Sequence, residues 1–133
     1  MVKLQDILKM DYPVYAHTDK NGGKDELLEE HIARCQKYYL SLKKEKDIDN
    51  ILIRFFNKMG LSRDGAGMKF AKDCFEQIIF FHDLGKIKPA FQKFIMKNKH
   101  IGKLDSEDSN DTGHSLLSSI IYMDYFLDRM NRS

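Results

Sequence analysis

The heptapeptide Phe80-Phe81-His82-Asp83-Leu84-Gly85-Lys86 decides how the rest of this chain is interpreted. It places an adjacent histidine and aspartate at the end of a long apolar pattern. Counting back from His82, apolar residues recur at helical spacing: Ala71, Cys74, Phe75, Ile78 and Ile79. Residues with this spacing share one face of a single helix. The pattern therefore predicts that His82 continues a buried stripe, and that Gly85 ends the helix in the left-handed conformation.

A histidine and an aspartate at the end of a buried stripe need a partner. A carboxylate such as Asp83 is costly to bury without a cation or hydrogen-bond donors. Lys86 follows His82 by one helical turn, so it can point into the same site. A divalent metal ion is the simplest partner for this combination. The alternative is a helix end at which His82 and Asp83 cap and pair locally.

Two further histidines lie on predicted apolar helix faces. His31 belongs to a predicted helix from Asp25, its cap, to about Lys44, whose apolar face comprises Leu28, His31, Ile32, Cys35, Tyr38 and Tyr39. His114, in Gly113-His114-Ser115, comes one turn before Leu117 of a predicted last helix. Three inward histidines in one small helical domain favour ligands around a shared site. Imidazole with carboxylate suits manganese, iron, nickel or zinc, and magnesium is possible through carboxylate and water.

The remaining pattern predicts an all-α fold in one domain covering residues 1–133. A helix near 47–59 is expected to end at Gly60, with Ile48, Ile51, Leu52, Phe55, Phe56 and Met59 as its apolar face. Pro89 is expected to begin a short helix with Phe91, Phe94 and Ile95 inward. Residues 98–112 are expected to form a loop, and the last helix to run from Leu116 to about Arg129 with Leu117, Ile120 and Ile121 inward. No strand-like alternation persists, so no strand is predicted.

Charge is distributed unevenly along the chain. The net charge of +2 indicates no partner by itself. From Leu84 to Leu104, however, there is no acidic residue, while six lysines occur: Lys86, Lys88, Lys93, Lys97, Lys99 and Lys103. Such a run is either a solvated face or a patch that holds a polyanion across the metal site.

The two cysteines, Cys35 and Cys74, fall at core-facing helical positions and not in a metal-binding or redox spacing. They predict reduced thiols in a cytoplasmic protein. No run approaches the length of a membrane-spanning helix, and the N-terminus lacks the apolar region of a signal peptide.

These motifs together resemble the HD superfamily of metal-dependent phosphohydrolases, and most closely the HD nuclease domain of type I CRISPR systems. The resemblance covers nearly the whole chain. It is carried by Tyr15-Ala16-His17-Thr18, Glu30-His31, His82-Asp83-Leu84-Gly85-Lys86, Phe91-Gln92 and Gly113-His114-Ser115. It implies an HD-type helical bundle that works with a CRISPR helicase and effector complex, either fused to the helicase or in trans.

Carried over position by position, the resemblance implies that His31, His82, Asp83 and His114 are ligands of divalent metal ions. Asp83 would bridge two ions, and Lys86 would steady phosphate charge. The implied reaction is hydrolysis of phosphodiester bonds in single-stranded DNA. Lysines of the basic run would follow the DNA backbone without reading sequence: Lys88, Lys93, Lys97 and Lys99.

The resemblance also implies that the chain is the N-terminal portion of such a domain. Members of the family continue with a second histidine pair and a late aspartate, whereas this sequence ends at Ser133. Two alternatives remain. One is an HD phosphohydrolase acting on nucleotides, and the other is a non-catalytic HD module that binds a helicase or effector complex.

Overall fold

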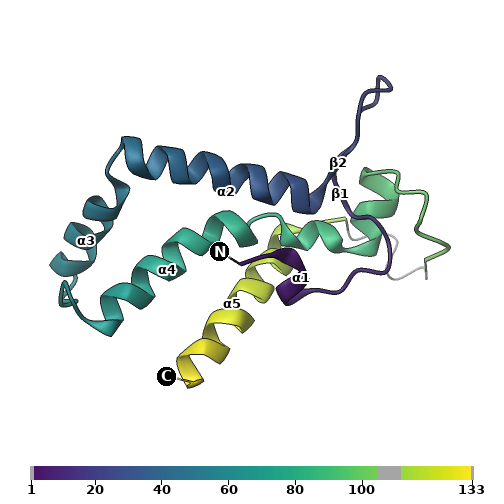
Figure 1. Ribbon diagram of the computed structural model, residues 1–133. Helices are drawn as coiled ribbons and strands as arrows, with labels where there is room; N and C mark the ends of the chain where they lie inside the picture. The colour runs from purple at the N-terminus through teal and green to yellow at the C-terminus, as the bar shows by residue number, and fades with distance from the viewer. Residues whose placement is uncertain (1, 105–111, 133) are drawn as a thin grey trace.

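A computed structural model describes residues 2–104 and 112–132 (Figure 1). In chain order, the elements are α1 (Leu4–Ile7), β1 (Tyr15–His17), β2 (Glu26–Leu27), α2 (Leu28–Glu45), α3 (Ile48–Lys58), α4 (Ala66–Phe81), the 3₁₀-helix η1 (Leu84–Ile87), the π-helical turn η2 (Phe91–Ile95) and α5 (Ser115–Arg132). The predicted all-α class is confirmed. Part of the predicted loop, residues 105–111, lies outside the described residues.

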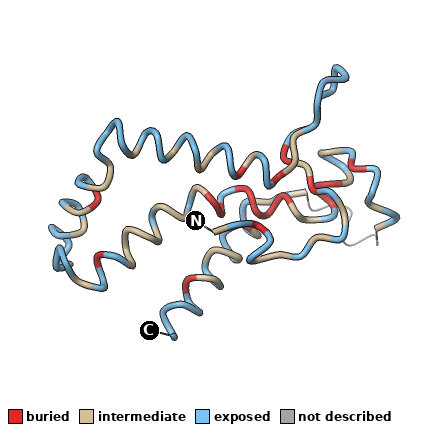
Figure 2. Tube along the Cα trace, in the orientation of Figure 1, coloured by how far each residue is buried: buried red, intermediate tan, exposed pale blue. Residues whose placement is uncertain are grey.

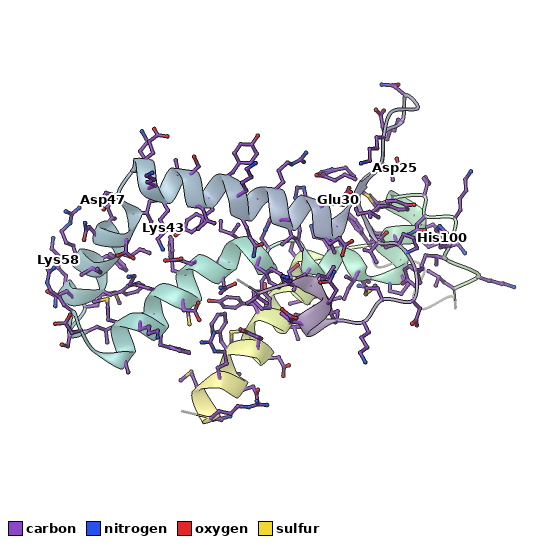
Figure 3. All side chains as sticks on the ribbon, in the orientation of Figure 1. Asp25, Glu30, Lys43, Asp47, Lys58 and His100 are labelled. Atoms are coloured by element: carbon purple, nitrogen blue, oxygen red, sulfur yellow. The ribbon has the colours of Figure 1, made fainter. Side chains whose placement is uncertain are left out.

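The long helices α2 and α4 run in opposite directions, and α3 joins them at one end (Figure 1). Lys43 on α2 points toward α4, where its Nζ lies 2.9 Å from Oε1 of Glu76 (Figure 3). Gly60, with φ of 99°, confirms the predicted stop after α3, because a left-handed backbone at this position favours glycine.

The hydrophobic core lies where α4 ends. Phe80 and Phe81 are each 1% exposed, and Leu28 and Leu84 are fully buried. Figure 2 shows the buried segments gathered at this end of α2 and α4 and along η1. Burial of each large side chain contributes about 1.5–3 kcal/mol to stability. Because core residues precede and follow the His-Asp pair, packing fixes the position of that pair.

The predicted buried stripe of α4 is only partly correct: Ala71, Cys74 and Ile79 are half-buried, and Cys74 packs against the core, but three of its members are not buried. Phe75 and Ile78 are 45% and 48% exposed, and the side chain of His82 is 42% exposed. The helix instead buries Met68, Phe80 and Phe81, because its neighbours pack on that face. The same exposure corrects other residues expected to face inward: Tyr38, Ile51, Phe55, Met59, Phe94, Ile95 and Ile120.

A short antiparallel hairpin was not predicted from the sequence. Tyr15 pairs with Leu27 and His17 with Glu26, across the turn that contains Gly22 at φ of 81°. The hairpin also corrects the expected start of α2. Asp25 does not cap that helix, because its carboxylate accepts a hydrogen bond from the backbone of Asp19.

Gly85 does not stop a helix in the left-handed conformation, because it lies inside η1 and has no positive φ. It is required for another reason. A Cβ at this position would lie 1.8 Å from the carbonyl oxygen of His114 and 2.9 Å from the backbone nitrogen of Ser118. The backbone N–H of Gly85 donates to Ser118 Oγ at 2.7 Å. Glycine therefore lets the start of α5 dock directly on η1.

Gln92 joins three segments beside this contact. Its Oε1 accepts from Tyr15 N at 2.9 Å and from Asn98 Nδ2 at 3.0 Å. Its Nε2 donates to Tyr15 O at 2.8 Å and to Lys86 O at 2.7 Å. Because Gln92 is fully buried, these bonds hold β1, η1 and the loop after η2 in one arrangement.

Candidate metal centre

Asp83, between α4 and η1, is the centre of the candidate site. Its side chain is 13% exposed, and ring nitrogens of three histidines face its carboxylate. The Nε2 atoms of His31 and His82 lie 3.1 Å and 3.4 Å from Oδ2. The Nε2 atom of His114 lies 3.6 Å from Oδ1. The structure thus brings together the four residues that the sequence predicted as metal ligands.

The ring of His82 is oriented by the end of its own helix. Its Nδ1 lies 2.6 Å from the carbonyl oxygen of Ile79, one turn earlier. A carbonyl oxygen only accepts, so Nδ1 carries the proton and donates. In the neutral ring, this leaves the lone pair of Nε2 directed toward Asp83. The exposure of His82 is therefore compatible with the predicted role, although the predicted burial is wrong.

His31 reaches Asp83 from the first turn of α2. Its ring lies between two carboxylates, with Nε2 toward Asp83 and Nδ1 3.2 Å from Oε2 of Glu26. The side chain is 13% exposed, because α2 packs against α4 at this level. His31 thus contributes a ring nitrogen from a helix distant in sequence from the His-Asp pair.

His114 comes from the residue that precedes α5. Its ring packs edge-on against Phe91, with 4.8 Å between the ring centroids. The close contact of its backbone with Gly85 brings it to the second oxygen of Asp83. This geometry fits the predicted bridging role of Asp83, since each carboxylate oxygen has at least one histidine beside it.

Lys86 supplies a fixed positive charge at the base of the cluster. The residue is 7% exposed, and its Nζ lies 2.9 Å from Asp83 Oδ2 and 3.4 Å from the carbonyl oxygen of Ala16. Burial by itself raises the pKa of Asp83. The hydrogen bond and charge of Lys86, with His82 and His31, lower it by more, so the pKa of Asp83 lies below its ordinary value. Asp83 is therefore ionised at neutral pH, as a metal ligand must be.

The spacing of these atoms fits a coordinated divalent ion. With metal–ligand bonds of about 2.1 Å, neighbouring ligand atoms are about 3.0 Å apart in an octahedron and about 3.4 Å apart in a tetrahedron. The separations of 3.1 Å and 3.4 Å from Asp83 Oδ2 to the Nε2 atoms of His31 and His82 are compatible with these values, and they are also the distances of direct imidazole–carboxylate contacts. Two imidazoles and a carboxylate are also a donor set that manganese, iron, nickel and zinc accept.

Sequence reasoning missed Glu26 and Cys35, which border the cluster. His17, Glu26 and His31 offer ligand atoms within 4.8 Å of one another, and so do His31, Cys35 and His82. Glu26 was missed because it lies in β2, just before α2, and not on the helical face that carries His31. The spacing of Cys35, one turn after His31, was the available signal for the second set.

Two members of these additional groups, Cys35 and His17, have features that disfavour metal ligation. Burial, and then the charge of Asp83, raise the pKa of the Cys35 thiol, whereas metal ligation needs the thiolate. The side chain of His17 is 58% exposed, and its Nε2 lies 3.9 Å from Glu26. Burial, followed by the charges of Lys86 and His31, lowers the pKa of His17.

The four lysines predicted to bind nucleic acid follow η1 in the chain. Lys88 and Lys93 are half-buried, and Lys93 donates to the carbonyl oxygen of Gly102 at 2.7 Å. Lys97 and Lys99 are exposed, in the loop that also carries His100, labelled in Figure 3. Lys93 also lies over the ring of Phe94, and its role in binding nucleic acid stays a prediction.

Comparisons of the chain with protein-family models, curated proteins and solved structures gave no match. The geometry itself defines an all-α protein with a histidine–carboxylate cluster at the end of α4. Among residues 2–104 and 112–132, no helix has the length and apolar character needed to cross a membrane.

Proposed function

We propose that this chain is a cytoplasmic, HD-type, metal-dependent nuclease domain that hydrolyses phosphodiester bonds of single-stranded DNA in CRISPR antiviral defence. One observation carries the metal-dependent part of the proposal. The Nε2 atoms of His31 and His82 converge on one oxygen of Asp83, while the Nδ1 atom of each ring faces an acceptor on its far side. Two ring nitrogens beside one carboxylate oxygen are a donor set that suits a bound cation, although the ammonium of Lys86 also contacts that oxygen at 2.9 Å.

In this proposal, His31, His82, Asp83 and His114 hold one or two divalent ions such as manganese, nickel, iron or magnesium. When bound, such an ion lowers the pKa of a coordinated water and neutralises charge on the scissile phosphate. The residues of the chain supply the arrangement. Asp83 stays ionised because Lys86 lowers its pKa, and the buried ammonium of Lys86 adds positive charge at the base of the cluster.

The choice of single-stranded DNA rests on the sequence motifs and the basic run. Lys97 and Lys99 are exposed lysines in the segment after η2, and a flexible polyanion is held by such charges without sequence readout. A CRISPR helicase, fused or in trans, is the proposed source of the single strand. The alternative of nucleotide hydrolysis predicts that mononucleotides compete with the DNA for cleavage.

The test measures metal content and cleavage of circular single-stranded DNA with manganese. The chain is compared with the double variant His82→Ala/Asp83→Ala. We expect the wild-type chain to bind metal and cleave the circle, and the variant to lose both. A matched control is Asp128→Ala, because Asp128 lies on α5 and pairs with Arg132 at 2.9 Å. Cleavage that survives in the double variant would refute the proposed centre.

A second candidate function is a non-catalytic module that binds a helicase or effector complex. One feature of α5 favours it. Apolar side chains at helical spacing along this helix are 50–74% exposed: Leu116, Ile120, Met123, Leu127 and Met130. A contiguous apolar stripe of this kind is typical of a protein interface. Stable binding to a partner, with no bound metal and no cleavage, would favour the module.

A further inference from the structure

The carboxylate of Glu26 lies behind His31, on the side away from Asp83. Its Oε2 is 3.2 Å from His31 Nδ1, and its Oε1 is 2.6 Å from Nη2 of Arg34. The side chain is 16% exposed, so its contacts are largely shielded from water. Glu26 belongs to β2, whereas His31 and Arg34 belong to α2. The hairpin therefore delivers this carboxylate to the back of a candidate ligand.

The position of Glu26 constrains which nitrogen of His31 can bind a cation. A neutral imidazole has one N–H and one lone pair, and a carboxylate only accepts. Donation from Nδ1 to Glu26 leaves the lone pair on Nε2, which faces Asp83 at 3.1 Å. Histidines that bind metals commonly donate their other N–H to a carboxylate, which fixes the ring and raises its basicity.

Arg34 makes a direct ligand role for Glu26 unfavourable. Its guanidinium holds the other carboxylate oxygen in a short, charge-assisted hydrogen bond. An ion placed on Glu26 would lie close to this permanent positive charge. The more distant His17, at 3.9 Å from Glu26, is beyond hydrogen-bond distance and does not compete for the same oxygen. The arrangement therefore suits orientation of His31 better than direct coordination by Glu26.

We propose that Glu26 is a positioning residue of the metal centre, which holds the proton of His31 on Nδ1 and thereby presents Nε2 to the ion. This inference rests on the proposed function, because it assumes that His31 is a ligand. The carbonyl oxygen of Ile79 orients His82 in the same way, because it accepts a hydrogen bond from Nδ1 of that ring. The difference is that Glu26 is a side chain, so its contribution can be removed by substitution.

The experiment compares the full chain with Glu26→Leu, which removes the acceptor, and Glu26→Gln, which keeps an acceptor oxygen without the charge. Zn²⁺ is the probe, because it is diamagnetic and suits a histidine-rich site. Calorimetry gives its Kd and stoichiometry, and nitrogen-15 NMR of the zinc-loaded chain reports the His31 Nδ1–H. Glu29→Leu is the matched control, since Glu29 is exposed in the first turn of α2, three residues from Glu26, and accepts a hydrogen bond from Gln5 at 3.0 Å.

We expect Glu26→Leu to bind the same number of zinc ions as the wild-type chain with a Kd about 10–100-fold higher. The Nδ1–H signal of His31 should be lost by fast exchange in Glu26→Leu and kept in Glu26→Gln, which should lose less affinity. The control should match the wild-type chain. Circular dichroism checks that both variants keep the wild-type fold. If Glu26 had only a structural role, the Nδ1–H signal of His31 would be the same in both variants.

Two results would refute the positioning role of Glu26 and leave the proposed function standing. One is an unchanged zinc affinity in Glu26→Leu. The other is a stoichiometry lower by one ion in that variant, which would make Glu26 a direct ligand. Absence of zinc binding by the wild-type chain would instead refute the proposed function, and the inference with it. The wild-type measurement therefore separates the two failures.

Discussion

Replacement of Gln92 by leucine tests how the segments that carry the site are joined. The side chain is fully buried, and its amide makes hydrogen bonds with Tyr15 N, Tyr15 O, Lys86 O and Asn98 Nδ2. Leucine has a similar size but satisfies none of these groups. Each lost bond costs about 1 kcal/mol, and more where the partner stays buried without a replacement. We therefore expect a loss of about 4 kcal/mol of unfolding free energy, a large part of the about 5–15 kcal/mol typical of a domain.

The assay is urea unfolding followed by circular dichroism, with the wild-type chain and the variant compared at one temperature. Gln77→Leu is the control, because the single hydrogen bond given for Gln77, to Asp73, is long at 3.4 Å. This control should change stability by no more than about 0.5 kcal/mol. A loss below about 1 kcal/mol in Gln92→Leu would show that water replaces the amide at little cost, and would refute the reasoning.

Three further outcomes follow from individual contacts. Gly85→Ala should lower both thermal stability and zinc affinity, because the added Cβ would lie 1.8 Å from the carbonyl oxygen of His114; unchanged values by differential scanning fluorimetry and calorimetry would contradict this. Hydrogen bonding to Lys72 lowers the pKa of Asp49, so its stabilisation is present above the pKa of an unfolded aspartate and is lost as the pH falls through the lower folded-state pKa. Because the side chain of Asp49 is 43% exposed, Asp49→Asn should lower the free energy of unfolding by only about 0.5 kcal/mol at neutral pH. This difference from the wild-type chain should vanish in acid. Urea unfolding measured across pH tests this, and a difference that grows as the pH falls would contradict it. Lys99→Ala should weaken binding of single-stranded DNA at low salt and reduce the slope of log K against log salt by about 0.7; an unchanged slope in fluorescence anisotropy would remove Lys99 from the proposed contacts.

Periodicity in the sequence predicted the long helices but not their neighbours. The 3.6-residue repeat placed α2, α3, α4 and α5 close to their observed bounds, because local spacing alone generates a helical face. It does not show whether another element covers that face. Phe75 and Ile78 remain half-exposed for this reason, and the predicted burial of His82 failed with them.

The candidate site was predictable to the extent that it depends on side-chain chemistry. Asp83 is adjacent to His82 in sequence and Lys86 follows it by four residues, and the other two histidines were found by their positions on helix faces. Glu26 was not found, because it lies just before α2 and off the helical face on which His31 was recognised, five residues from it in sequence. The role of Gly85 was also missed, since it depends on the approach of α5 to η1 and not on local backbone conformation.

The buried ion pair between Lys86 and Asp83 has a consequence for how the site would exchange its ions. The carboxylate is already neutralised by an ammonium group at 2.9 Å, so an arriving divalent ion meets no net negative charge from this pair. A bound ion would then be held less tightly than beside an unpaired carboxylate, and it would leave more readily. For the same reason, the neutral pair would not offset the charge of a bound ion. The centre would then carry the full positive charge of the ion toward an approaching phosphodiester, so weak retention of the metal and strong attraction of the substrate would have a common origin in Lys86.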